Sequence, residues 1–311
     1  MASKSSLVRA GMVLLALVVI SAVLPDCASA QAPPFITQWG TFGSGNGQFN
    51  IPVGVAVDAV GDVYVVESEG GRLQKFTSSG GYITGWPLTF PAGVAVDVSG
   101  NVYVTDGSED QDLVVKFTST GTFLTQWGGF PSGKGLAVDQ SGNVYVPDLV
   151  EGLVYKFTGE GTLLTRFGHF HEPDGVAVDA TGNVFVVEHH GCRIQKFTST
   201  GTFITTWGSV GSGNGQFLLP TRIAVDGSGN VYVADYGNHR IQVFTNSGAY
   251  VTQWGSFGSG PGQFSGNIGI AVDGSGCVYV ADTNNHRVQK FGPLPTPTMA
   301  TSWGRLKRMY R

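Results

Sequence analysis

Histidine and carboxylate side chains gather between residues 169 and 190, and this mixture could bind a metal ion. The stretch contains Glu188 and four histidines, His169, His171, His189 and His190. Imidazole nitrogens and carboxylate oxygens are ligands that Zn²⁺ takes in proteins. A divalent-metal site is therefore one hypothesis for this stretch, and four solvated loop histidines are the other. The sequence shows no serine nucleophile with a nearby base and no phosphate-binding loop, so no catalytic residue and no other cofactor are predicted.

These residues belong to a chain with an internal repeat. A Val-Asp pair recurs at intervals of 39 to 47 residues, with its aspartates at Asp58, Asp97, Asp139, Asp179, Asp226 and Asp273. Each copy holds four short segments rich in β-branched and aromatic residues, separated by Gly, Asn and Ser turns. Such segments predict four antiparallel strands per repeat. Six copies arranged radially predict an all-β, six-bladed β-propeller with four strands in each blade.

The strand count also predicts how the ring closes. Only five outer strands follow third strands in the sequence, because Gly-Pro-Leu-Pro follows Phe291 and cannot continue as a strand. A matching segment, residues 35–40, stands before the first repeat. We expect this N-terminal segment to complete the last blade, which would cover an exposed strand edge and latch the two ends of the ring together.

The repeat units resemble the NHL-repeat family. The resemblance rests on Gly-Ser-Gly-Asn-Gly-Gln-Phe at 43–49 and 211–217, on Val-Tyr-Val-Ala-Asp at 278–282, and on the Asn-His-Arg run at 285–287. It covers residues 35–291, most of the chain that follows the N-terminal segment. It implies a six-bladed propeller, and because this fold hosts several functions it implies no single activity.

Most of the repeated polar residues are interpreted as structural. The Val-Asp aspartate precedes a tight turn, where its carboxylate can accept backbone N–H bonds. A second acidic residue ends each second strand, and in four blades an arginine begins the next strand, which predicts salt bridges inside those blades. The arginines are Arg72, Arg193, Arg240 and Arg287, and leucines replace them at 113 and 153. His239 and His286 belong to the same loop pattern and are not predicted to be ligands.

Residues that break the repeat are the candidates for binding. The positions that frame the channel mouth are mostly glycine or apolar, and Lys134, Asp174 and Arg222 are the polar exceptions. These three, together with the aromatic Tyr236, are predicted to contact a ligand on the face formed by the loops between blades and the loops between second and third strands. This ring contains no symmetric set of metal ligands.

The N-terminus carries the features of a signal peptide, predicted to span residues 1–30. Lys4 and Arg9 precede an uncharged apolar run at 11–24, which is shorter than the roughly 20 residues of a membrane span. Ala28-Ser29-Ala30 then offers a cleavage site. We expect a secreted, periplasmic or cell-surface protein without a stable membrane span, and an uncleaved anchor is the alternative. The sequence before Cys27 argues against a lipid anchor.

Charge is distributed unevenly along the chain. The formal net charge is −4, although four basic residues lie in the last seven positions. The propeller, expected at 31–292, is therefore more acidic than the whole chain, which argues against a nucleic-acid partner. Residues 293–311 are predicted to form a Pro/Thr-rich linker and a basic tail, which could contact an acidic polymer or lipid or be a disordered end.

Two cysteines, Cys192 and Cys277, remain after signal cleavage. The predicted fold places them at opposite ends of blades that are not neighbours. A disulfide spans only about 6 Å between Cα atoms, so no disulfide is predicted.

The expected function is that of an extracellular or periplasmic binding scaffold, a monomer whose loop face contacts a protein or a cell-surface glycan. The alternative is a metal-dependent lyase. Related propellers, the amidating lyases and the streptogramin lyases, use metals and histidines at the channel, and the four histidines above are the only candidates here. The intracellular NHL functions in RNA binding and ubiquitin transfer do not suit an acidic chain with a signal peptide and no RING cysteines.

Overall fold

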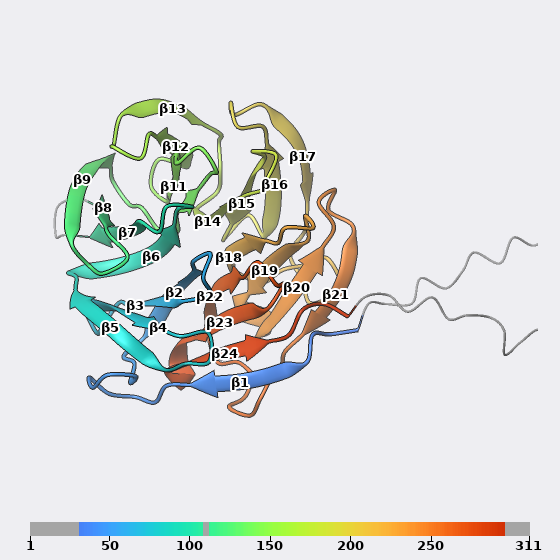
Figure 1. The fold of residues 1–311 in the computed structure, drawn as a ribbon. Coiled ribbons are helices and arrows are strands. Elements are labelled where there is room, and N and C mark those ends of the chain that lie inside the picture. Colours follow the sequence, from blue (N-terminus) through green and yellow to red (C-terminus); the bar gives the residue numbers. More distant parts are fainter. Residues whose placement is uncertain (1–30, 108–111, 296–311) are drawn as a thin grey trace, which may run out of the picture.

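The protein is described by a computed structural model over residues 31–107 and 112–295. The predicted signal peptide and the tail from residue 296 onward lie outside the described residues. Six four-stranded antiparallel sheets surround a central axis (Figure 1). The predicted all-β, six-bladed propeller is therefore confirmed. None of the described residues forms a helix of the length and apolarity that crossing a membrane requires.

Each blade runs from an inner strand at the axis to an outer strand at the rim. Blade 1 consists of β2 (Pro52–Val57), β3 (Val63–Glu67), β4 (Arg72–Phe76) and β5 (Tyr82–Pro87). Blade 2 consists of β6 (Phe90–Val96), β7 (Val102–Gly107), β8 (Asp112–Phe117) and β9 (Phe123–Phe130). Blade 3 consists of β10 (Ala137–Val138), β11 (Val144–Asp148), β12 (Leu153–Phe157) and β13 (Leu163–Phe167).

The second half of the ring follows the same order. Blade 4 consists of β14 (Pro173–Val178), β15 (Val184–Glu188), β16 (Arg193–Phe197) and β17 (Phe203–Trp207). Blade 5 consists of β18 (Pro220–Val225), β19 (Val231–Asp235), β20 (Arg240–Phe244) and β21 (Tyr250–Trp254). Blade 6 consists of β22 (Asn267–Val272), β23 (Val278–Asp282), β24 (Arg287–Phe291) and β1 (Phe35–Trp39). Single 3-10 turns at Tyr236–Asn238 and Thr283–Asn285, which the sequence did not predict, precede β20 and β24.

The last blade takes its outer strand from the N-terminus, as predicted. β1 pairs antiparallel with β24, with Gln38 opposite Gln289 and Trp39 opposite Val288. The blue strand therefore lies beside the red one in Figure 1. Lys290 also donates a hydrogen bond of 3.0 Å to the backbone oxygen of Ser78 in blade 1. The two ends of the ring are thus joined by a strand pairing and by a contact between blades.

The core lies between neighbouring blades. Second strands are buried on both faces because each lies in the middle of its blade and between two other blades. In one cluster, Tyr64 and Leu73 of blade 1 pack with Val102 and Phe117 of blade 2. A methyl group on Gly80 would stand 2.7 Å from the indole of Trp39, so this turn glycine lets the outer-strand tryptophan of the preceding blade pack closely.

The repeated acidic residues have the predicted structural roles. Asp226 accepts backbone N–H bonds of 2.9 Å from Ser228 and Asn230 and a 3.0 Å bond from the Tyr232 hydroxyl. Burial and the neighbouring carboxylate Asp226 raise the pKa of Tyr232. The four predicted salt bridges inside the blades form, with N–O distances of 2.5–2.8 Å.

One aspartate of this set also joins two blades. Burial alone would raise the pKa of Asp179, but hydrogen bonds from Asn246, Thr181 and Asn183 outweigh that effect and lower it to about 2. Asn246 belongs to blade 5 and Asp179 to blade 4, at a distance of 3.0 Å. The turn is therefore part of the packing between blades.

Candidate functional site

Glycine backbone lines the channel where neighbouring blades meet. Five of the six blades place a glycine in or just before the inner strand, and these are Gly54, Gly93, Gly135, Gly175 and Gly269. A Cβ atom on Gly93 would lie 2.6 Å from the carbonyl oxygen of Lys134, and one on Gly175 would lie 2.5 Å from that of Thr221. The repeat therefore holds glycine at this position because adjacent inner strands approach each other backbone to backbone.

Arg222 takes the sixth position, and its side chain crosses the channel. Its Nη1 donates to the carboxylate of Asp174 in blade 4 and, at 3.0 Å, to the Asp174 backbone oxygen. Its Nη2 donates at 3.1 Å to the backbone oxygen of Ala92 in blade 2, on the opposite side of the ring from blade 5. The guanidinium thus joins three blades across the channel and lines a cavity of about 40 Å³ between the inner strands.

The loop face opens into a much larger cavity of about 620 Å³, to which Arg222 also contributes. Predicted ligand contacts Lys134, Asp174, Arg222 and Tyr236 all line it. The structure therefore brings these four residues to one place, although their role in binding stays a prediction. Tyr236 is half-buried there. Among the described residues, the Lys134 ammonium makes no ion pair within 4.0 Å, whereas Arg222 and Asp174 pair with each other.

Three of the four histidines are neighbours. His189 and His190 line the cavity with their ring centroids 5.0 Å apart, and the exposed His171, which does not line it, has its ring centroid 6.0 Å from that of His190. His169 is exposed outside the cavity. His190 bonds through Nδ1 to the Glu172 carboxylate, and the His189 Nδ1 lies 3.1 Å from the Pro220 backbone oxygen. Within residues 31–107 and 112–295, no group of three or more His, Cys, Asp or Glu side chains is placed to hold a metal ion.

The carboxylate that the metal hypothesis requires is already engaged. Glu188 is fully buried and accepts bonds from Arg193 at 2.5 Å, from the His171 backbone N–H at 2.8 Å and from Gln195 at 2.6 Å. In the part of the chain that the structure describes, Glu188 is therefore not available to join the histidines around a metal ion.

Several residues of the cavity were not predicted from the sequence. Its walls include the apolar side chains of Val53, Phe90 and Leu149, and Glu172 lies beside the histidines. Glu172 could have been found in the sequence. It precedes the proline that begins the inner strand of blade 4, and the apolar residues Ile51 and Leu219 take this position in blades 1 and 5. No comparable irregularity marks the apolar wall, because apolar residues occur throughout the repeat.

The two cysteines of the propeller are free thiols. Cys192 is buried in the loop before β16, where its Sγ contacts the His189 backbone oxygen at 3.5 Å. Cys277 is half-buried at the turn before β23 in blade 6. The thiols therefore belong to different blades, as predicted.

Comparison with known proteins identifies the repeat and the fold. The NHL repeat matches at residues 49–76, 88–115, 170–197, 217–244 and 268–291. No curated protein matches the chain.

Solved structures share the fold at low sequence identity. A gluconolactonase from Xanthomonas campestris is 16% identical with a TM-score of 0.62, and the match covers 86% of this chain and 98% of that one. The virginiamycin B lyase from Staphylococcus aureus is 13% identical with a TM-score of 0.60, over 83% of this chain and 99% of the lyase. A streptogramin B lyase is 18% identical with a TM-score of 0.57, over 76% and 77%. At these identities the likeness concerns the fold alone, and the chain is a six-bladed β-propeller in which five blades, all but blade 3, match the NHL repeat.

Proposed function

We propose that the protein is a binding scaffold whose loop-face cavity holds part of a protein or a glycan. The observation that supports this most directly is the cavity of about 620 Å³. Ligand sites in proteins commonly occupy roughly 300–1,000 Å³ and combine apolar walls with a few placed polar groups. Because the Arg222 side chain spans the channel from Asp174 to Ala92, we place ligand entry and exit at the loop face.

The lining favours a ligand group with an apolar ring face and a hydrogen-bond acceptor. Phe90 and Tyr236 offer aromatic surface of the kind on which sugar rings and aromatic side chains pack. Lys134 supplies a cation with no ion pair among the described residues, which suits a carboxylate or hydroxyl oxygen. Arg222 and Asp174 pair with each other at the bottom of this cavity and neutralise each other's charge.

We also propose that this scaffold acts outside the cytoplasm, as a monomer in the periplasm, at the cell surface or in the medium. Its support is the sequence of residues 1–30, which lie outside the described residues. The partner then comes from among extracellular proteins and cell-surface glycans rather than nucleic acids.

Filling the cavity is expected to abolish ligand binding. The Ala92→Trp variant adds an indole at the cavity wall without changing any charge, whereas Val98→Trp adds the same group at an exposed turn at the other end of blade 2. The fluorescently labelled chain is tested on arrays of surface glycans and extracellular protein domains, and hits are titrated. Ala92→Trp should weaken every specific hit at least tenfold, and Val98→Trp should leave it unchanged. Hits that persist in Ala92→Trp, or an array without any hit, would contradict the proposal.

The lyase alternative predicts a bound metal ion and can be tested separately. The structural neighbours include lyases, and His189 and His190 line the cavity, but the described residues do not form a three-ligand group. We therefore expect less than a tenth of an equivalent of any transition metal in purified chain 31–311 by mass spectrometry. One equivalent that is lost in a His189→Ala/His190→Ala variant would instead support the lyase and remove the pure scaffold proposal.

A further inference from the structure

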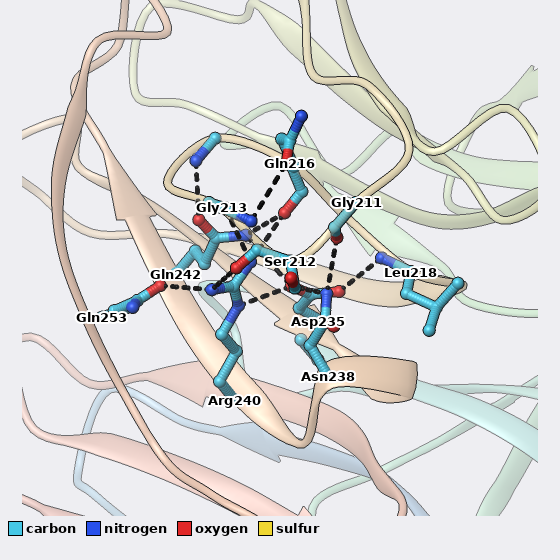
Figure 2. A network of polar contacts seen from close by, with 12 residues as sticks. Gly211, Ser212, Gly213, Gln216, Leu218, Asp235, Asn238, Arg240, Gln242 and Gln253 are labelled. Carbon is cyan, nitrogen blue, oxygen red and sulfur yellow. Dashed lines mark hydrogen bonds and ion pairs between the residues drawn. The ribbon is translucent and has the colours of Figure 1, made fainter.

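Three blades contain an arginine that binds the loop entering its own blade. In blade 5, Arg240 donates to the backbone oxygens of Ser212 at 2.7 Å, Gly213 at 2.9 Å and Gln216 at 2.8 Å (Figure 2). Arg72 binds the backbone oxygens of Ser44, Gly45 and Gln48 in the same way, and Arg287 binds those of Ser259, Gly260 and Gln263. Each guanidinium therefore holds one glycine-rich loop by its main chain.

A glutamine two residues later completes each of these loop sites. Gln242 donates at 2.6 Å to the Gln216 backbone oxygen and accepts at 2.9 Å from the Gly215 backbone N–H. Gln74 and Gln289 make the equivalent pair of bonds in blades 1 and 6. Figure 2 shows Arg240 and Gln242 facing the same loop. Together, the two side chains recognise three carbonyls and one N–H of a tight peptide loop.

Blade 4 has the arginine and the glutamine but lacks the loop. In blade 5 the loop runs from Gly208 to Phe217, with eight residues between them. In blade 4 the equivalent Gly168 and Phe170 are separated by His169 alone. Phe170 is buried like Phe217, so the connection into blade 4 reaches the same core position although it is seven residues shorter than the connection into blade 5.

The groups that would bind this loop are consequently unfilled. Within the described residues, Arg193 bonds to Glu188 only, and its side chain is 43% exposed, against 19%, 8% and 6% for Arg72, Arg240 and Arg287. Gln195 uses its Nε2 on Glu188, and its Oε1 has no partner among those residues. Gln195 is half-buried, whereas Gln74, Gln242 and Gln289 are at most 1% exposed.

A short connection does not by itself leave an arginine and a glutamine without a loop to bind, as the two other blades with short connections show. The connections that lead into blades 2 and 3 also lack the glycine-rich segment. In these blades, Leu113 and Leu153 replace the arginine, and Val115 and Tyr155 replace the glutamine. Only blade 4, among the six, retains the polar pair without the loop that fills it elsewhere.

We propose that Arg193 and Gln195 form a second binding site, which takes a glycine-rich peptide loop of a partner protein in the place of the missing loop. The matching segment has the form Gly-Ser-Gly-x-Gly-Gln-Phe and presents three backbone carbonyls to Arg193 and Gln195. Because the buried Glu188 lies directly against the Arg193 guanidinium, the site is close to neutral, which favours carbonyl oxygens over a free anion. Neither residue lines the large cavity, so the site does not depend on the function proposed for it.

The test uses this chain's own loop as the probe. An N-acetylated, C-amidated peptide with the sequence of residues 208–218 is titrated into ¹⁵N-labelled protein 31–311, and the Arg193 Nε–H and nearby amide signals are followed. We expect saturable shifts for this peptide and none for a scrambled peptide. Arg193→Lys keeps the charge beside Glu188 but loses the fork geometry, and it should weaken binding at least tenfold.

A loop graft provides the matched control. Replacing His169 with the sequence of residues 209–216 leaves Arg193, Gln195 and every cavity residue unchanged, and it should fill the site from within the chain and remove peptide binding. Absence of saturable binding to the unmodified protein would overturn the proposal, as would equal binding to the grafted chain. Tighter binding of acetate or inorganic phosphate than of the peptide would also overturn it, since the site would then be an anion site. Because the cavity is unaltered throughout, none of these results bears on the Ala92→Trp test.

Discussion

A chain that lacks residues 31–40 should lose at least about 5 kcal/mol of unfolding free energy, and we expect it to be unfolded or aggregated at room temperature. These residues contain β1, which supplies the outer strand of blade 6 (Figure 1). Deletion removes the half-buried Trp39, which packs on Phe76 and Tyr279, and full burial of an aromatic side chain is worth about 3–5 kcal/mol, so this contact supplies part of the loss and the strand pairing the rest. It also exposes the edge of β24, and unpaired strand edges promote aggregation.

The control is a chain in which the deleted strand is returned at the other end. Gly292 donates at 2.7 Å to the Pro34 backbone oxygen, so the end of β24 and the start of β1 are adjacent. Joining residues 35–40 to Phe291 through the Thr-Asn-Ser-Gly turn of blade 5 (245–248) should rebuild blade 6 as an ordinary blade. We expect most of the lost stability to return in thermal and urea unfolding followed by tryptophan fluorescence. If the deleted chain unfolds at the wild-type midpoint, the latch has no energetic role.

The Arg287→Leu substitution should cost about 3–5 kcal/mol, which is the usual loss when one partner of a buried ion pair is removed. The Arg287 side chain is 6% exposed, and its partner Asp282 is fully buried. The same guanidinium also holds the loop before β22 and donates at 2.8 Å to Gln38 of β1. The substitution therefore leaves a buried carboxylate without its cation and releases both the loop and the latching strand.

The matched substitution is Arg193→Leu, which removes the same residue type from the same position in blade 4. Arg193→Leu also leaves a buried carboxylate, Glu188, without its cation, but Arg193 is 43% exposed, so water can replace part of the lost contact. Arg193 also binds no loop among the described residues, so we expect a smaller loss of about 1.5–3 kcal/mol, the range for a hydrogen bond to a charged group. Urea unfolding of both variants beside the wild type, with m-values compared, measures the difference. Equal losses would mean that the loop contacts add nothing to the salt bridge between arginine and acid.

The number of blades, the order of strands and the source of the closing strand could all be predicted from the sequence. Each strand of the repeat has its own composition, so a missing outer strand at one end and an extra one at the other could be recognised directly. The role of the Val-Asp aspartates in their turns could also be predicted, because the turn partners lie within six residues along the chain, whereas the bond from Asn246 to Asp179 spans 67 residues and could not. Local spacing suffices for interactions of this range.

The candidate site was only partly predictable for a related reason. Lys134, Asp174 and Arg222 were found because they interrupt a regular position, but nothing in the spacing showed that Arg222 would pair with Asp174, or that Lys134 would make no ion pair within 4.0 Å in the described part of the chain. The proposed metal ligands Glu188 and His190 shared a loop in the sequence, yet the fold directs Glu188 inward to Arg193 and His190 outward to Glu172. The direction of a side chain depends on strand pairing and packing, which composition does not specify.

The repeat in the sequence thus determined the fold, because each blade is a local unit whose strands follow one another along the chain. The tertiary structure decided which parts of different blades meet. Ala92 and Arg222 are 130 residues apart and come together across the channel only when the ring closes. The exposure of Arg193 likewise could be recognised only by comparison with the three arginines that bind loops. An arginine at this position is buried or exposed according to the length of the connection that leads into its blade.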